Sequence, residues 1–139
     1  MSISYMEMAI ADYQKVYKLW GKTEGIGLSD ADEKENTARF LDRNPGTSFV
    51  AYDGSLLVGA LLCGNDGRRG YVHHLAVRES RRRLGIGSTL IKGCLAKLEK
   101  LNIHKCHLFV FVDNSDAISF WESIGWEKRG ELLLMSKYT

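Results

Sequence analysis

Apolar residues recur along the chain at two spacings, and together these predict a protein built from strands and helices. After Gly87 apolar side chains return every three or four residues as far as Leu101, which is typical of a helix with one buried face. The stretch 107–112 is almost continuously apolar, which favours an interior strand buried on both faces. The pattern therefore predicts an α/β protein with a long amphipathic helix ahead of a buried strand.

Turn residues and weaker patterns mark out the remaining elements. Asp53 and Gly54 separate two apolar stretches, a strong signal for a hairpin turn. The expected elements, in chain order, are a strand at 2–10, a helix from Asp12 to Gly21, a helix from Ser29 or Asp30 to near Pro45, strands at 48–52, 56–63 and 71–77, the long helix, the strand at 107–112, a helix from Asn114 or Ser115 to Gly125, and one or two closing strands in 126–138. This order predicts one α/β domain over 1–139 (α+β in some schemes), with a mixed sheet and helices on both faces.

A basic turn with two glycines joins the strand that ends at Val77 to the long helix. Gly85 and Gly87 have no Cβ, so backbone N–H groups can approach an anion closely there. The first turn of the helix adds unpaired amides and the positive end of the helix dipole. Three arginines, Arg81 to Arg83, add guanidinium groups that suit phosphate oxygens. A solvated basic turn is the alternative, but this combination favours an anion site.

The charge balance limits the partners that the turn suggests. The formal net charge is only +2, which is too small to indicate binding to nucleic acid or to a membrane. The positive charge is concentrated at 78–83, so the expected ligand is a small polyanion.

The cysteines and histidines show no metal-ligand spacing. Cys63, Cys94 and Cys106 form no CxxC pair and lie in apolar runs, which favours reduced thiols and a cytoplasmic protein. His104 and His107 flank Cys106 without a second cluster, so no metal is expected. No apolar run approaches the ~18 residues of a membrane span, so none is expected.

Two motifs resemble those of the GCN5-related N-acetyltransferase (GNAT) family. The first is Arg82-Arg83-Leu84-Gly85-Ile86-Gly87, which follows a Leu-Ala-Val strand end at 75–77. The second is Asn114-Ser115-Asp116-Ala117, followed by Trp121 and then by Gly125-Trp126. The resemblance follows the order of elements over almost the whole chain, and the two motifs are specific when they occur together at this spacing.

The resemblance implies a mostly antiparallel sheet of six or seven strands that splays between the fourth and fifth, with acetyl-CoA or CoA as co-substrate in the gap. Backbone groups of Leu75 and Val77 would pair with the pantetheine arm, and the amides after Arg83 would cradle the pyrophosphate. The residues so implied in cofactor binding are Leu75, Ala76, Val77, Arg82, Arg83, Leu84, Gly85, Ile86, Gly87, Ser88, Asn114, Ala117 and Trp121.

Two departures from the family pattern affect these expectations. Members commonly have Pro where this chain has Glu79 and Gly where it has Arg83, so the turn is expected to be less preset and more charged. Many members have a tyrosine in place of Trp121 that protonates the departing thiolate. An indole N–H is a far poorer acid than a phenol, so this role is not carried over.

Acetyl transfer to an amine needs a group that removes a proton, because an alkyl ammonium has a pKa of ~10.4. His73 and His74 are adjacent on a strand, and alternation places them on opposite faces, His73 with Tyr71. Some family members use a histidine at the position of His73. We hypothesise that His73, with Tyr71 and a water, accepts the proton, the alternative being a half-buried histidine satisfied by a neighbour. The backbone N–H of Leu75 is the expected donor to the oxyanion.

Two functions remain open. The leading hypothesis is an N-acetyltransferase that moves an acetyl group from acetyl-CoA to a primary amine by direct attack, with a small molecule, peptide or protein N-terminus as acceptor. The alternative is a non-catalytic acyl-CoA sensor of the same fold, which the tryptophan at position 121 supports. The sequence leaves open the acceptor and the choice between monomer and homodimer.

Overall fold

The computed structural model describes residues 2–139, which divide into two compact units. The first unit extends to Phe109 and the second comprises Val110–Thr139. The first unit contains a sheet with its covering helices, and the second contains one helix and the C-terminal segment. Among the described residues no helix is both long and apolar enough to cross a membrane.

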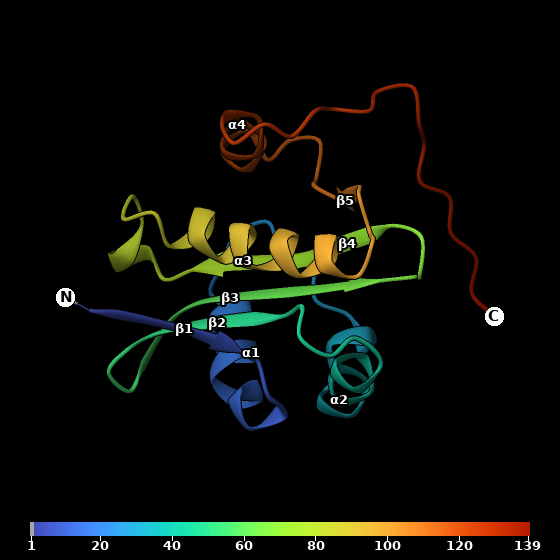
Figure 1. Cartoon of the computed structure of the whole chain (residues 1–139). Coiled ribbons are helices and arrows are strands. Elements are labelled where there is room, and N and C mark those ends of the chain that lie inside the picture. The colour runs from blue at the N-terminus through green and yellow to red at the C-terminus, as the bar shows by residue number, and fades with distance from the viewer. Residues whose placement is uncertain (1) are drawn as a thin grey trace. The chain divides into compact units, whose positions relative to one another are not determined.

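Five strands form one mixed sheet in the order β1-β2-β3-β4-β5 (Figure 1). They are β1 (Ile3–Glu7), β2 (Phe49–Asp53), β3 (Leu56–Asn65), β4 (Gly70–Val77) and β5 (Cys106–Leu108). The first four pair antiparallel, whereas β5 joins β4 in parallel. The predicted hairpin turn is confirmed, with Gly54 at a φ of 61° that favours glycine.

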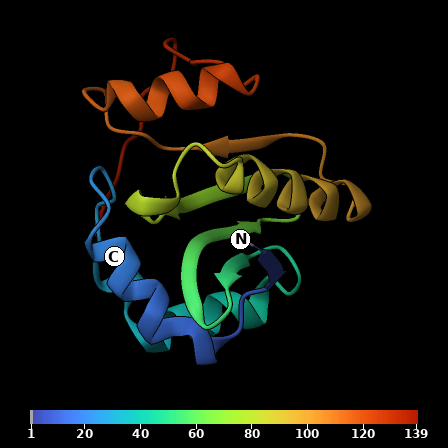
Figure 2. The same ribbon diagram turned by 90° about the vertical axis from the view of Figure 1, so that its left-hand side faces the viewer.

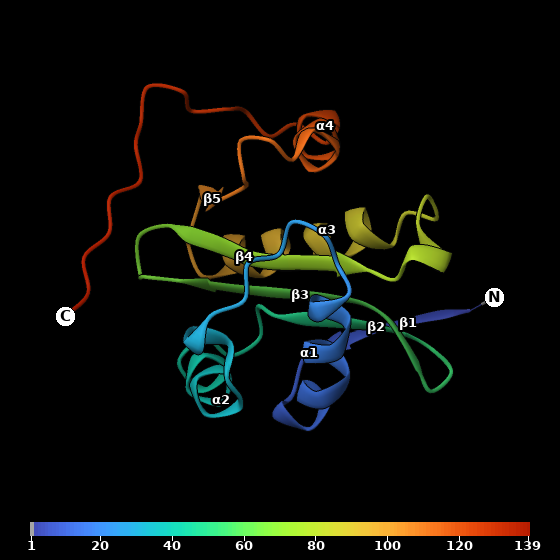
Figure 3. The same ribbon diagram turned by 180° about the vertical axis from the view of Figure 1, so that it is seen from behind.

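Helices cover both faces of the sheet, as predicted. Figures 1 and 3 show α1 (Tyr13–Gly21) and α2 (Lys34–Arg43) on one face and α3 (Ile86–Lys100) on the other. The view in Figure 2 shows the strands twisting between these two layers. Short 3₁₀ turns, η1 (Ile10–Asp12), η2 (Asp30–Asp32) and η3 (Glu79–Arg81), connect the larger elements.

The helical spacings of the sequence correspond to buried helix faces. On α1, Val16 and Trp20 are fully buried against β3 residues such as Leu57 and Leu62. On the opposite face Ile86 and Leu90 of α3 lie so close to β3 that a Cβ on Gly59 would approach Ile86 Cγ2 to 2.9 Å. The start of α3 is therefore pressed directly onto the sheet, which positions the basic turn before it.

Two predicted helix starts differ in detail. Asp12 does not cap α1; its carboxylate instead accepts hydrogen bonds from the backbone N–H of Ala9 and the hydroxyl of Tyr52. Ser29 caps the turn η2 rather than α2, since its side chain accepts from the N–H of Ala31. These polar residues close tight turns ahead of each helix, a role that competes with N-capping.

The prediction of a long interior strand at 107–112 is wrong. Strand β5 has three residues and lies at the edge of the sheet, and Phe109, Phe111 and Val112 are exposed. A continuous apolar run indicates burial potential, but it does not specify how far a neighbouring strand continues to pair with it.

The second unit confirms the last predicted helix and contradicts the closing strands. In α4 (Ser115–Ser123) the Asn114 side chain accepts from the N–H of Ala117, as a cap does. Gly125 has a φ of 98°, and the N–H of Trp126 bonds to the carbonyl of Trp121 at 3.0 Å, so the helix ends in a Schellman motif. Residues 126–139 form no strand, so the sheet has five strands rather than six or seven. Apolar composition supplies strand propensity but not a pairing partner.

Candidate active site

Strand β4 has an unpaired backbone edge where it parts from β5. The parallel pairing ends at Val72, whereas β4 continues to Val77. On the other side of β4, the N–H of Arg78 donates to β3 at 2.8 Å. Hydrogen-bonded pairs alternate in an antiparallel ladder, so Ala76 also bonds to β3 while Leu75 and Val77 direct their N–H and C=O groups away from it. The predicted splay between the fourth and fifth strands is confirmed.

The arginines of the following turn have separate partners. Arg82 donates from Nε to the carbonyl of Val77 at 3.1 Å, and so it occupies part of the free edge of β4. Arg81 forms an ion pair with Asp53 at 3.3 Å and is therefore directed at the hairpin rather than at an anion site. Arg83 is exposed and makes no ion pair within residues 2–139.

The first turn of α3 presents unpaired amides. Gly85 precedes the helix with a φ of 80°, and a Cβ there would meet nothing within 4 Å, so glycine is needed for its conformation rather than for space. The backbone N–H and the hydroxyl of Thr89 both bond to the Gly85 carbonyl. The N–H groups of residues 86–88 precede this first helical bond and are free for a ligand.

A cavity of about 260 Å³ adjoins this turn. It is bounded by the end of α1 and by the residues after β4: Leu19, Lys22, Thr23, Val77, Arg78, Glu79, Ser80 and Arg82. Three of the lining side chains are cationic and one is acidic, so the space beside the free edge of β4 is predominantly positive.

A β-bulge in β4 brings two histidines to the same face of the sheet. Successive residues of β3 pair with Val72 and with His74, which leaves His73 as an extra residue. The ring of His73 packs edge-on against Phe40 of α2 at 5.3 Å between centroids, and the ring of His74 lies 4.8 Å from that of Trp20 of α1. Both histidines therefore face α1 and α2, and the prediction of opposite faces is wrong.

The surroundings of His73 favour its neutral form. Its ring is stacked near Tyr71, with centroids 6.4 Å apart, and borders Phe40. Desolvation of the ring, and next the neighbouring His74, lowers the pKa of His73 below its ordinary value, while the Asp32 carboxylate acts in the opposite direction. The residue as a whole remains exposed, so a neutral imidazole is accessible beside the parting of β4 and β5.

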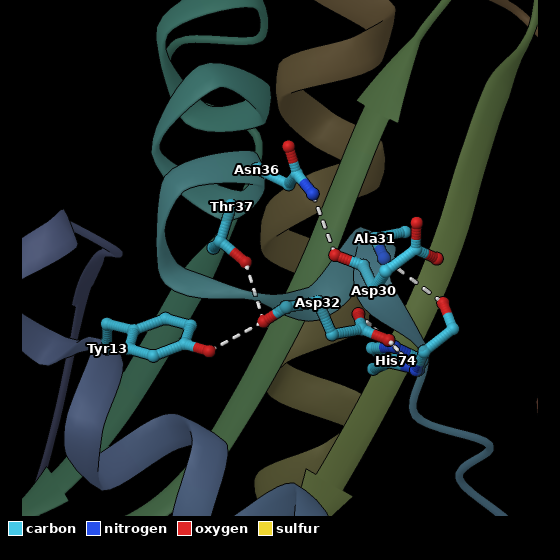
Figure 4. A network of polar contacts seen from close by, with 8 residues as sticks. Tyr13, Asp30, Ala31, Asp32, Asn36, Thr37 and His74 are labelled. Atoms are coloured by element: carbon cyan, nitrogen blue, oxygen red, sulfur yellow. Dashed lines mark hydrogen bonds and ion pairs between the residues drawn. The ribbon is translucent and has the colours of Figure 1, made fainter.

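The buried Asp32 and the half-buried His74 form a polar pair (Figure 4). Oδ1 of Asp32 lies 2.8 Å from Nε2 of His74, and Oδ2 accepts the N–H of Ser29 at 3.0 Å. The backbone carbonyl of Asp32 accepts the hydroxyls of Tyr13 at 2.7 Å and Thr37 at 3.2 Å. This network joins η2 to α1, α2 and β4, all of which belong to the first unit.

The sequence did not predict this pair. Alternation along the strand placed His74 on the face opposite His73 and Tyr71. Asp32 and His74 are 42 positions apart, and no local spacing indicates that they meet. The other predicted residues, Asn114, Ala117 and Trp121, belong to the second unit, where the Trp121 ring is 5.0 Å from that of Trp126.

Comparison with known proteins assigns the family. The sequence model of the acetyltransferase (GNAT) family matches residues 13–126. An acetyltransferase of Sodalis glossinidius is 30% identical over 126 residues, covering 91% of this chain and 88% of that protein. The fold is similar to that of the PaiA N-acetyltransferase of Thermoplasma acidophilum in complex with coenzyme A, with a TM-score of 0.79, 21% identity and 91% of each chain covered. It is also similar to an aminoglycoside 6'-N-acetyltransferase of Acinetobacter haemolyticus, with a TM-score of 0.75, 16% identity and coverage of 100% and 99%. The chain thus belongs to the acetyltransferase (GNAT) family.

Proposed function

We propose that this protein, an acetyl-CoA-dependent N-acetyltransferase, transfers the acetyl group to a primary amine by direct attack within a ternary complex. The observation that carries the proposal is the free edge of Leu75 and Val77, which leads along the chain to the unpaired amides at the start of α3. A pantetheine arm can pair with such an edge as a strand does, and a diphosphate is suited to helix N-terminal amides.

Cofactor binding would use backbone groups more than side chains. Leu75 and Val77 would bond the pantetheine amides, and residues 84–88 would surround the pyrophosphate with N–H groups. Ala76 already uses its backbone groups toward β3. Arg82 and Arg83 would supply charge, which for Arg82 requires it to leave the Val77 carbonyl.

The second unit is proposed to belong to the same domain. The family match runs from residue 13 to residue 126 without a break at the boundary of the two units. Asn114, Ala117 and Trp121 are accordingly proposed to contact the cofactor, although the side chain of Asn114 also caps α4.

The chemistry requires an oxyanion donor and a proton acceptor. The N–H of Leu75 faces away from β3 and is proposed to donate to the oxygen of the tetrahedral intermediate, a contact worth ~3 kcal/mol in comparable sites. His73, with Tyr71 and a water, is the proton acceptor that the sequence predicts. The departing CoA thiolate, with a thiol pKa of ~8.5, leaves without the tyrosine that Trp121 replaces.

The acceptor is proposed to be an amine on a small molecule or a peptide. One fold neighbour acts, by its name, on aminoglycoside antibiotics. Tyr71 and His73 lie on the face of the sheet that α1 and α2 cover. We propose that the acceptor enters from this side. The free thiols of Cys63, Cys94 and Cys106 support a reducing compartment such as the cytoplasm. A non-catalytic sensor is not favoured, because the relatives at 30% identity are acetyltransferases.

Two measurements test the proposal. A thermal-shift series with CoA, acetyl-CoA and ATP should show stabilisation by both CoA species, by ~2.7 kcal/mol at 100 times the dissociation constant. Thiol release from acetyl-CoA should then be followed with a panel of polyamines, aminoglycosides and peptides. Thiol release in the presence of at least one amine supports the transferase. Binding of acetyl-CoA without thiol release in the presence of any amine supports the sensor. A lack of stabilisation by either CoA species contradicts both.

A further inference from the structure

The Asp32–His74 pair is more firmly held than any polar side chain that the proposed function uses. The two side chains are 7% and 12% exposed, respectively. Both carboxylate oxygens of Asp32 accept hydrogen bonds, and its backbone carbonyl accepts two more, from Tyr13 and Thr37. A carboxylate is rarely buried unless such partners hold it. Hydrogen bonds from α1 and α2 therefore fix Asp32, and Asp32 in turn bonds to the imidazole of His74 on β4.

The bond to Asp32 determines which nitrogen of His74 is free. An ionised carboxylate only accepts hydrogen bonds, so Nε2 carries the hydrogen that points at Oδ1. In a neutral ring Nδ1 then holds a lone pair, and within residues 2–139 it makes no hydrogen bond. His74 is therefore oriented as a proton acceptor at Nδ1.

The position of His74 suits acetyl transfer. It lies just beyond the last pair of β4 with β5 and directly before Leu75, whose N–H is the proposed oxyanion donor. Trp20 borders the ring at 4.8 Å and restricts its rotation. His73 lies on the same face of the sheet because of the bulge, but no carboxylate is hydrogen-bonded to it within residues 2–139.

We propose that Nδ1 of His74 accepts the proton lost by the acceptor ammonium, and that Asp32 is its positioning residue. This inference rests on the proposed function. The ammonium N–H bond breaks and its proton goes to Nδ1; the freed amine forms an N–C bond to the acetyl carbon, and the C–S bond breaks. The second amine proton neutralises the CoA thiolate, and the imidazolium returns its proton to water. Each turnover thus yields one amide, one thiol and one proton.

Charges around the pair agree with this assignment. The Asp32 carboxylate faces His74 from η2 and stabilises the imidazolium that forms, as an aspartate does behind a catalytic histidine. From β4 itself the neighbour is His73, whose pKa is lowered partly by His74, so the two rings do not favour simultaneous protonation. From α1 the Tyr13 hydroxyl donates to the backbone carbonyl of Asp32. Burial, and then the charges of Tyr17, Asp32 and Glu33, raise the pKa of Tyr13, so it stays neutral.

The test uses one variant that keeps the hydrogen bond to Asp32 but lacks the basic nitrogen of His74, and one that alters Asp32 itself. His74→Gln retains a donor N–H near the position of Nε2, so its bond to Asp32 is preserved while the proton acceptor is lost. We expect kcat at pH 7 to fall about 100-fold or more, with the acid limb of the pH–rate profile replaced by a steady rise with hydroxide. Asp32→Asn should lower kcat and leave KM nearly unchanged, because Nδ1 remains a proton acceptor while the ring loses the carboxylate that orients it.

A matched control separates effects on the ordering of the turn η2 from effects on proton transfer. Asn36 donates to the carbonyl of Asp30 at 2.7 Å, so it stabilises η2 without contacting the Asp32–His74 pair by a hydrogen bond. Asn36→Ala should leave the shape of the profile unchanged. All variants should keep the thermal shift caused by CoA, which confirms that they are folded.

The outcomes distinguish a failure of the proposed role of His74 from a failure of the proposed acetyltransferase function. If His74→Gln keeps the acid limb and a kcat within threefold of the wild type, the inference is overturned while the transferase stands. Loss of the limb in His73→Asn, with the limb retained in His74→Gln, also overturns it and returns the role to His73. Absence of thiol release by the wild-type protein with every amine refutes the proposed function itself.

Discussion

Replacing Arg83 by glycine should stabilise the turn before α3 relative to an alanine replacement. Arg83 has a φ of 66°, in the left-handed region that costs a residue with a Cβ roughly 1–2 kcal/mol. Glycine adopts this conformation freely but loses ~0.5–1 kcal/mol of chain entropy on folding. Both variants lose the same guanidinium, so their difference of about 1 kcal/mol isolates the backbone term.

The effect is within reach of calorimetry. An unfolding entropy near 2.1 cal/mol/K per residue amounts to about 0.3 kcal/mol/K for 139 residues, so ~1 kcal/mol corresponds to about 3 °C in Tm. We expect Arg83→Gly to melt about 3 °C above Arg83→Ala, measured without ligand by differential scanning calorimetry. Titration with CoA should show both variants weakened by a similar factor through the lost charge. Equal Tm values for the two variants would refute the assignment of a strained left-handed residue.

Three further predictions concern other parts of the first unit. Tyr52→Phe removes the hydroxyl that donates to Asp12 at 2.6 Å, so stability at pH 7 should fall by about 1–2 kcal/mol in urea titrations. In the wild type the pKa of Tyr52 is raised to about 12, chiefly by burial. The contribution of the Tyr52 hydroxyl to stability should therefore be complete below pH 10 and disappear as the pH rises through 12. Alkaline unfolding that is unchanged in the variant would contradict this. The pKa of His73 is lowered mainly by desolvation, so the unfolded chain binds this proton more tightly than the folded protein does. Stability should therefore fall as the pH drops below ~6.5. His73→Asn should flatten that decline, and an unaltered slope in the variant would contradict the prediction. Gly59→Val places side-chain atoms against Ile86, where a Cβ would already lie at 2.9 Å, so it should cost about 1–3 kcal/mol and weaken CoA binding, whereas tight binding by the variant would show that α3 adjusts freely.

Local patterns in the sequence were sufficient for much of the fold. The three- and four-residue spacing that ends at Leu101 predicts α3, and the Asp-Gly pair at 53 and 54 predicts the β2–β3 hairpin. The glycine at 85 adopts the left-handed conformation that the turn requires. In each case the signal lies within a few residues of the element that it specifies, so no tertiary information is needed.

The features that the sequence missed depend on pairing between distant segments. The bulge at His73 arises from the register of β4 against β3, which alternation along one strand cannot reveal. The Asp32–His74 contact requires η2 to lie against β4, and the premature end of β5 at Leu108 depends on where two strands diverge. Thus the glycine-containing turn before α3 was predictable from local sequence, whereas the contact between Asp32 and His74 was not.

Hydrogen exchange of the backbone amides, with and without CoA, tests the binding of the cofactor most directly. The amides of Leu75 and Val77 face away from β3, while that of Ala76 is bonded to it and serves as an internal control. We predict that CoA slows exchange at Leu75, at Val77 and at residues 86–88, and leaves Ala76 nearly unchanged. Saturation with CoA that leaves these five amides exchanging as they do in the free protein would contradict the account.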